Sequence, residues 1–466
     1  MTARLLLVTV AIAAALSADA PAVRTGSGPT PQPTLVTPVL SLRRVPNLVA
    51  RLVADSSLAA EIDRAMGDPV LGGAVEASCL AVSDQRGRAV YGRRADVALI
   101  PASTLKVTVA TAVLDRIGAG SRFTTAVRAT APPRDGLVGD LWLVGGGDPL
   151  LSTADFAVDA GFAGQTRLAT SLEALADGIV AAGVRRVEGR VLGDDSRYDR
   201  ERFVPSWPAK YLTGLEISPI SALVVNKSIL VGSRPKVFAT EPEIHAANVL
   251  ANLLAGRGVT VAGTAAGVVP PGATTVASVD SPLMADVLGE VLQHSDNLGA
   301  EMLVKELGLR FGAGGTTAAG VGVVKEHLRA VGVAPDGLAA ADGSGLDRSD
   351  RLTCAVLQGV LSRSGEQGQL ARALPVAGYT GTLAKRFIGT PAAGKVRAKT
   401  GSLEGVVGLG GWAAGSDGRA LQFALLANEV PTARIGAALQ DKVVSALARY
   451  PQAPPADLLA PREPGG

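Results

Sequence analysis

Two spacings of apolar residues recur along the chain: one of about 3.6 residues, as in helices, and one of two residues, as in strands. The first predicts helices over residues 101–117, 171–182, 242–255, 283–294 and 298–307. The second predicts strands over residues 79–83, 89–91, 137–144, 186–192, 395–400, 406–413 and 420–428. Because strands near both ends of the chain enclose the helices, we expect one mixed sheet that is built from both termini.

The order of these elements predicts a discontinuous main domain, residues 47–122 and 238–450, interrupted by an insertion over 123–237 that carries strands of its own. Six prolines stand among Gly, Ser and Thr in residues 21–46 and predict an extended linker, because such a composition does not form a packed core. Residues 451–466 are also rich in Pro and Gly and predict a disordered tail.

The first twenty residues have the three parts of a secretory signal peptide. A basic start at Arg4 precedes an apolar run over 5–16, and Ala18-Asp19-Ala20 forms a cleavage site of the A-x-A type. The apolar run is short for a bilayer span, so an uncleaved membrane anchor is the less favoured alternative. We therefore expect an extracytoplasmic protein, in the periplasm or the cell wall, with no stable transmembrane domain after cleavage.

Composition narrows the classes of function. Hydrophobic residues make up 47% of the chain, which predicts a packed globular protein. A net charge of only +3 and an aromatic content of 3% give no indication of a nucleic-acid partner. The only histidines, His245, His294 and His327, are too few for a multi-histidine metal site, and no metal or organic cofactor is implied. Secretion would allow Cys79 and Cys354 to pair, but the sequence leaves this open.

Candidate chemistry begins with Ser103 and Lys106, three residues apart at the start of a predicted helix. Residues at this spacing share a helical face, and the N–H groups of a helix N-terminus favour the oxyanion formed when a serine attacks an acyl group. The lysine can serve as the base only if burial or a second cation lowers its pKa. This S-x-x-K pair alone is weak evidence, since an ordinary N-cap serine gives the same pattern.

Two further motifs supply what a serine–lysine site lacks. The S-x-N motif at 295–297 joins two predicted helices, and the K-T-G motif at 399–401 ends a predicted strand. They add a hydroxyl that can relay a proton, a carboxamide that can hold a substrate backbone, and a second ammonium group. S-x-x-K, S-x-N and K-T-G in this order are the signature of penicillin-binding proteins and serine β-lactamases.

From about residue 75 to residue 450 the chain resembles the low-molecular-mass class C penicillin-binding proteins, the D-Ala-D-Ala carboxypeptidase and endopeptidase family. Members of this family insert extra domains after the S-x-x-K helix. Class A β-lactamases, in contrast, have a short spacing between the S-x-x-K and S-x-N motifs, and class C β-lactamases carry Tyr in place of Ser295. The segments that carry the resemblance are Pro101-Ala-Ser-Thr-Leu-Lys106, Gly139-Asp-Leu141, Gly147-Asp-Pro149, Ser218-Pro-Ile-Ser-Ala-Leu223, Ser295-Asp-Asn297, Asp342-Gly-Ser-Gly-Leu346, Gly378-Tyr-Thr-Gly-Thr-Leu383 and Lys399-Thr-Gly-Ser402.

The resemblance implies a mixed α/β fold, similar to penicillin-binding proteins and serine β-lactamases, with an antiparallel sheet flanked by helices and an inserted, mainly β domain. Many members have two inserted domains. Residues 123–237 have room for one, so we expect the second to be reduced or missing.

The resemblance also implies a reaction. Ser103 would be acylated by the penultimate D-Ala of a peptidoglycan stem peptide, with Lys106 as base. Ser295 would shuttle a proton, Asn297 would bind the substrate amide, and Lys399 would support the electrostatics. β-Lactams, which mimic the D-Ala-D-Ala amide, would trap the serine.

Further residues would bind the substrate. Thr400 would bind the terminal carboxylate, Gly401 would allow close approach, and the backbone N–H groups of Ser103 and Ser402 would form the oxyanion hole. An extended substrate would pair with the sheet edge at 397–403. In members that act on diaminopimelate stems, an Asp in a Gly-Asp-Pro loop reaches the free end of the stem; Asp148 matches it, although a turn residue before a proline explains it equally well.

Two alternatives stay open beside a secreted D-Ala-D-Ala carboxypeptidase with or without endopeptidase action. One is a β-lactamase or esterase on the same scaffold, and the other is a catalytically idle protein that binds the cell wall. The preference for diaminopimelate or lysine stems is not decided by these motifs.

Overall fold

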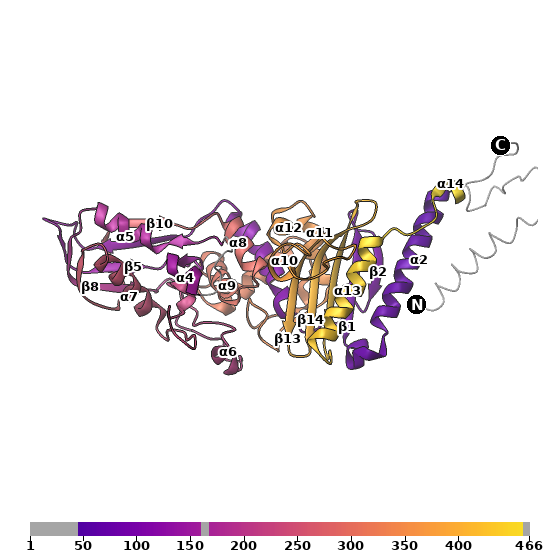
Figure 1. The fold of residues 1–466 in the computed structure, drawn as a ribbon, viewed down its shortest axis with the longest axis horizontal. Coiled ribbons are helices and arrows are strands. Elements are labelled where there is room, and N and C mark those ends of the chain that lie inside the picture. Colours follow the sequence, from indigo (N-terminus) through magenta and orange to yellow (C-terminus); the bar gives the residue numbers. More distant parts are fainter. Residues whose placement is uncertain (1–44, 160–166, 460–466) are drawn as a thin grey trace, which may run out of the picture.

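The computed structural model describes residues 45–159 and 167–459. The predicted signal peptide and the linker up to residue 44 lie outside the described residues. The molecule is elongated (Figure 1), with a first domain that carries both described chain ends and a second domain at the opposite end. Among the helices in the described ranges, none is both long and apolar enough to cross a membrane.

The first domain is built on a five-stranded antiparallel sheet with the order β13-β14-β15-β1-β2. Its strands are β1 (Ser78–Asp84), β2 (Ala89–Arg93), β13 (Val396–Leu403), β14 (Val406–Ala414) and β15 (Ala420–Ala427). β1 pairs with β15 from Ser78 opposite Ala427 to Asp84 opposite Leu421, so the two ends of the chain meet in the middle of the sheet. This confirms the prediction of one sheet built from both termini, but the sheet is antiparallel throughout and not mixed as predicted. The order of strands leaves β13 at an edge.

Helices cover both faces of this sheet, and alternate side chains of β1 enter the two cores. Leu80 and Val82 pack with α2 (Pro46–Met66) and α13 (Ala433–Arg449), whereas Cys79 and Ala81 face the core of the other layer. The other layer contains α8 (Met284–Gln293), α9 (Asn297–Phe311), α10 (Thr317–Ala330), α11 (Cys354–Ser364), α12 (Gln369–Ala373) and short strands β11 (Leu338–Ala339) and β12 (Arg351–Leu352). Burial on both faces explains why β14 and β15 are almost continuously apolar.

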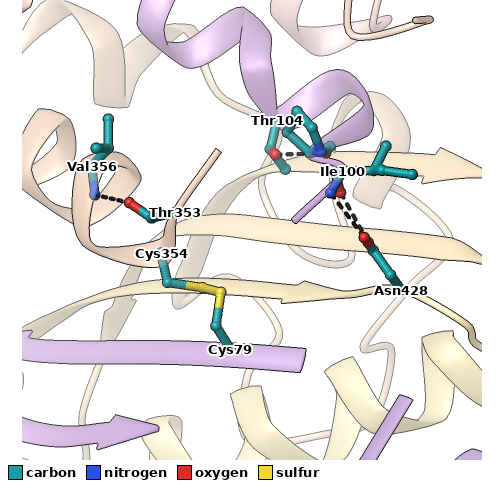
Figure 2. Close-up of a disulfide and its surroundings, with 8 residues drawn as sticks. Cys79, Ile100, Thr104, Thr353, Cys354, Val356 and Asn428 are labelled. Atoms are coloured by element: carbon teal, nitrogen blue, oxygen red, sulfur yellow. Dashed lines mark hydrogen bonds between the residues drawn. A yellow bond between two sulfur atoms is a disulfide. The ribbon is translucent and has the colours of Figure 1, made fainter. Parts of the chain in front are cut away.

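The helix predicted over 101–117 is present, but it changes its winding along its length. It begins as a 3₁₀ turn, Ala102–Leu105, continues as α3 (Lys106–Ala112), and ends as a π-type turn, Val113–Gly118. Asn428, next to the end of β15, holds the chain just before this helix: its Oδ1 accepts from Ile100 N at 2.8 Å and its Nδ2 donates to Ile100 O at 3.0 Å (Figure 2).

Cys79 of β1 and Cys354 of α11 form a disulfide, with Cα atoms 6.0 Å apart (Figure 2). Both residues are fully buried, so the bond ties the sheet to the helix through the middle of the core. The sequence left this pairing open because the two cysteines are 275 residues apart.

The second domain contains a six-stranded mixed sheet covered by helices. Its strands are β3 (Thr124–Ala129), β4 (Leu137–Val138), β5 (Leu141–Val144), β8 (Arg186–Asp194), β9 (Thr260–Ala266) and β10 (Thr274–Asp280), and its main helices are α5 (Leu172–Ala181) and α7 (Pro242–Ala255). Shorter elements are α4 (Ala154–Asp159), β6 (Leu151–Ser152), β7 (Thr170–Ser171) and α6 (Lys210–Thr213).

This domain corrects the predicted boundary of the insertion at residue 237. β9 pairs in parallel with β8, and such a pairing needs a crossover, which α7 provides. β10 then pairs with β3, and Ser281 N donates to Phe123 O at 2.9 Å where the chain leaves the domain. The insertion therefore runs from about residue 123 to residue 281, and its helices make it mixed rather than mainly β.

Two predictions at the chain ends also need correction. Pro46 belongs to α2 and not to the linker; it stands in the first turn, where its missing N–H is not needed. Part of the predicted disordered tail is ordered, because α14 (Ala456–Leu459) is a short helix that lies against α2 (Figure 1).

We expect the double substitution Cys79→Ala and Cys354→Ala to lower the free energy of unfolding by about 2–5 kcal/mol, because the bond restricts a very long loop of the unfolded chain. Urea denaturation followed by circular dichroism measures this. A reductant should lower the midpoint of the wild type and leave that of the double variant unchanged. An equal effect of the reductant on both proteins would contradict the assignment.

Candidate active site

Ser103 and Lys106 lie on the inner side of the first helical turn and touch each other. Lys106 Nζ is 2.8 Å from Ser103 Oγ, 2.7 Å from Asn297 Oδ1 and 2.6 Å from Ser344 O. A neutral amine has two N–H groups and one lone pair. Since the amide oxygen and the carbonyl oxygen can only accept, they take the two N–H groups, and the lone pair is left for the hydroxyl of Ser103.

The surroundings of Lys106 favour this neutral amine. The side chain is 1% exposed. Burial lowers the pKa of Lys106 to about 8, although the nearby carboxylates of Asp342 and Glu301 act in the opposite direction. A fraction of the amine is therefore neutral near pH 7 and can take a proton from Ser103, and this fraction rises toward alkaline pH.

Lys399 and Ser295 form a second amine–hydroxyl pair in the same site. Lys399 Nζ donates to Ser295 Oγ at 2.8 Å and to Thr400 O at 2.6 Å. Burial, reinforced by the charge of Lys106, lowers the pKa of Lys399 well below its ordinary value. Ser295 has a φ of 55°, a left-handed conformation that is uncommon for a serine and that turns the chain between α8 and α9.

Asn297 links the two domains at the site. Its Nδ2 donates to Glu216 O at 2.8 Å, which turns Oδ1 toward Lys106. Glu216 belongs to the segment between β8 and α7, whose apolar side chains pack with Leu298 and Met302 of α9. The orientation of the amide is thus set by the second domain.

These groups lie at a cleft of about 980 Å³ between the domains. Five of the predicted site residues line it: Ser103, Ser295, Asn297, Thr400 and Ser402. Lys106 and Lys399 lie beneath them, fully buried. The edge strand β13 forms one wall, and Thr400 Oγ1 lies 2.8 Å from Thr382 Oγ1 there.

Gly401 has a role in packing, beside its predicted role in the approach of the substrate. A Cβ at this position would lie 2.7 Å from Pro101 O and 3.1 Å from Thr104 N. The glycine therefore allows β13 to pack directly against the turn that carries Ser103.

Asp148 does not lie in the cleft. It is 3% exposed, and its Oδ1 accepts from Leu150 N at 2.9 Å, which is the bond of an Asx turn. Burial raises the pKa of Asp148 to about 6. The position corrects its assignment as a substrate-binding residue, because a folded loop places the carboxylate inside the second domain.

Sequence reasoning missed the loop around Ser344, whose carbonyl accepts from Lys106. Glu301 holds this loop: its Oε1 accepts from Gly343 N at 3.0 Å and from Ser344 N at 2.7 Å. The Asp342-Gly-Ser-Gly-Leu346 motif marks this loop in the sequence, but the group that contacts Lys106 is a backbone carbonyl, which no residue type reveals. The cleft is further lined by polar residues that no motif indicated: Lys210, Tyr211, Glu216, Arg348 and Glu404.

His294 also lines the cleft, where its ring nitrogens lie near two charged side chains. His294 Nδ1 lies 3.0 Å from Arg167 Nη2, and its Nε2 lies 3.5 Å from Glu290. Burial, with the charges of Arg167 and Lys227, lowers the pKa of His294 to about 4. Among the described residues, no group of three His, Cys, Asp or Glu could hold a metal ion.

A serine hydrogen-bonded to a buried lysine, with a second serine–lysine pair beside it, is the arrangement expected of a serine acyl-transfer site. The D-Ala-D-Ala carboxypeptidase 3 (S13) family model matches residues 58–236 and 231–450. The chain belongs to this family and is a serine-type carboxypeptidase, a hydrolase of the penicillin-binding class.

Relatives and solved structures agree with this membership. The chain is 31% identical, over 476 residues, to a D-alanyl-D-alanine carboxypeptidase of an Actinomadura species, with 85% of each chain covered. It is 33% identical, over 364 residues, to carboxypeptidase DacB of Mycolicibacterium smegmatis, with 75% of each covered. Penicillin-binding protein 4 of Haemophilus influenzae has the same fold, with a TM-score of 0.69 and 19% identity over 80% of this chain and 96% of that one.

We expect the rate of acylation to fall at acidic pH, because protonated Lys106 has no lone pair for Ser103. With a pKa of about 8, the rate at pH 6 should be roughly a hundredfold below its alkaline plateau. The second-order rate constant for a fluorescent penicillin, measured from pH 5 to pH 9, tests this. A flat profile would contradict Lys106 as the base.

Proposed function

We propose that this protein is a secreted D-Ala-D-Ala carboxypeptidase that removes the terminal D-Ala from peptidoglycan stem peptides through an acyl-enzyme at Ser103. The observation that carries the proposal is the position of one amine, Lys106 Nζ, between Ser103 Oγ and Asn297 Oδ1. Secretion is supported by the signal-peptide pattern and by the disulfide, which is typical of oxidising compartments.

In the acylation step, Lys106 takes the proton of Ser103 Oγ while this oxygen bonds to the carbonyl carbon of the penultimate D-Ala. The carbonyl oxygen becomes an oxyanion, which the backbone N–H groups of Ser103 and Ser402 would stabilise. The C–N bond then breaks, and the leaving amine of the terminal D-Ala needs one proton.

Ser295 is placed to deliver that proton. Its Oγ lies in the cleft and accepts from Lys399, so it can give its own proton to the amine. The proton that Lys106 took from Ser103 then replaces the one that Ser295 gave away, which balances the step. Both amines are buried, so these proton transfers occur away from bulk water. Water then attacks the ester, with Lys106 again as base, and the shortened stem leaves.

The substrate is proposed to bind as an extra strand on β13. This strand is at the edge of its sheet, and the bridge between Val376 and Arg397 covers only its beginning. Beyond that bridge, Thr400 and Ser402 line the cleft, where the hydroxyl of Thr400 can donate to the terminal carboxylate. The same chemistry on the D-Ala amide of a cross-link would be endopeptidase action.

We expect a fluorescent penicillin to label the wild type covalently and to leave the Ser103→Ala variant unlabelled. The label should be long-lived, since a carboxypeptidase releases a β-lactam slowly. Gel fluorescence after labelling and the rate of penicillin hydrolysis provide the two measurements. No label on the wild type, or equal label on the variant, would exclude both the carboxypeptidase and the β-lactamase. Fast penicillin turnover would instead favour the β-lactamase.

We also expect D-Ala release from a stem pentapeptide, measured by a coupled assay for the free amino acid. Because Asp148 is buried in a turn outside the cleft, Asp148→Asn should leave the ratio of rates on diaminopimelate-containing and lysine-containing pentapeptides within about twofold of the wild type. A tenfold change in this ratio would restore Asp148 as a specificity residue. Absence of D-Ala release from both peptides would contradict the proposed reaction.

A further inference from the structure

Lys227 forms an ion pair with Asp296, the middle residue of the S-x-N motif. Its Nζ donates to Asp296 Oδ2 at 2.7 Å, and the side chains are 27% and 8% exposed, respectively. Lys227 lies on the long segment between β8 and α7 of the second domain. The pair therefore crosses the domain boundary directly behind the two motif residues that face the cleft, Ser295 and Asn297.

The backbone that presents Lys227 is held in an unfavourable conformation. Asn226, Lys227 and Ser228 have φ values of 56°, 53° and 56°, which is one turn of left-handed helix without a glycine. Such a conformation costs about 1–2 kcal/mol per residue and persists only where the surroundings impose it.

The surroundings of this turn do impose it. The buried amide of Asn226 accepts from Thr153 N at 2.8 Å and donates to Thr153 Oγ1 at 2.9 Å, which fixes the turn to the second domain. Ser295, at the other side of the ion pair, is left-handed as well. Two strained turns thus face each other and are joined by one ion pair.

Because Asp296 is charged, its pairing with Lys227 affects the electrostatics around Lys106. Burial would raise the pKa of Asp296, but Lys227 holds it below its ordinary value, so the carboxylate stays charged. A buried carboxylate that loses its partner is costly and seeks another cation. Lys106 already interacts with it electrostatically, so an unpaired Asp296 would disturb the base.

We propose that Lys227 is a positioning residue for catalysis. By pairing with Asp296 across the domain boundary, it holds the S-x-N loop in the position in which Ser295 contacts Lys399 and Asn297 contacts Lys106. This role rests on the proposed function, since it is defined by the acylation of Ser103. Asn297 receives a second contact from the same segment, the carbonyl of Glu216 at 2.8 Å. The second domain is therefore a part of the catalytic site and not an appendage.

The test compares Lys227→Met with Lys227→Arg, using stopped-flow acylation by a fluorescent penicillin well below the melting temperature of each variant. This experiment separates the rate constant of acylation from the affinity of the first, non-covalent complex. Lys227→Met should lower the rate constant on the order of 10- to 100-fold with the affinity changed by less than about threefold, because the reacting groups are misplaced. Lys227→Arg keeps the charge and should recover most of the rate.

Arg197→Met is the matched control, because Arg197 also pairs across the boundary, with Glu306 of α9 at 2.6 Å, but away from the S-x-N loop. It should lower the melting temperature and leave the acylation rate constant within about twofold of the wild type. A Lys227→Met variant that acylates like the wild type, or an equal loss of rate in Arg197→Met, would overturn the proposal. Failure of the proposed function is a different result, namely no Ser103-dependent label on the wild type.

Discussion

Exclusion of water from one amine is the constraint on which the site depends. Lys106 is buried among groups that accept hydrogen bonds from its amine. This burial lowers the pKa of Lys106 to about 8, so that the amine can act as a base. A lysine at the surface would stay charged and could not activate a serine. The site must therefore bring polar groups into the protein interior and satisfy each of them, which Asn297 and the carbonyl of Ser344 do for Lys106.

Such burial requires backbones to approach one another very closely. Gly401 of β13 lets the edge strand lie against the turn of Ser103, and Gly345, with a φ of 80°, does the same from the opposite loop. A Cβ at residue 345 would lie 2.0 Å from Ala102 O. The glycines in these motifs thus allow the loops to pack closely around Ser103. The hydroxyl and amide groups beside them are the groups proposed to take part in the reaction.

The second domain contributes to this assembly from outside the sheet. Trp207 Nε1 donates to Asp342 Oδ2 at 2.8 Å, at the start of the loop whose carbonyl accepts from Lys106. Glu216 orients the amide of Asn297. The catalytic loops are therefore held between two domains, and the cleft for the substrate lies where the domains meet. The insertion that follows the nucleophile in the chain thus supplies part of the lining of the cleft.

Sequence alone predicted several elements and the candidate reactive groups, but helices such as α2, α10, α11 and α13 were not among the predicted elements. The helix at 242–255 and the three strands near the C-terminus follow from local periodicity, and the three motifs identified the serines, the lysines and Asn297, since these properties are written in neighbouring residues. Only the tertiary structure decided the rest. It placed β9 and β10 in the second domain, buried Asp148 in a turn, joined Cys79 to Cys354, and brought a backbone carbonyl and Lys227 to the site. These contacts join residues that are far apart in the chain, so no local sequence pattern predicts them. Every residue has a backbone carbonyl, so the sequence also cannot show which carbonyl lies at the site.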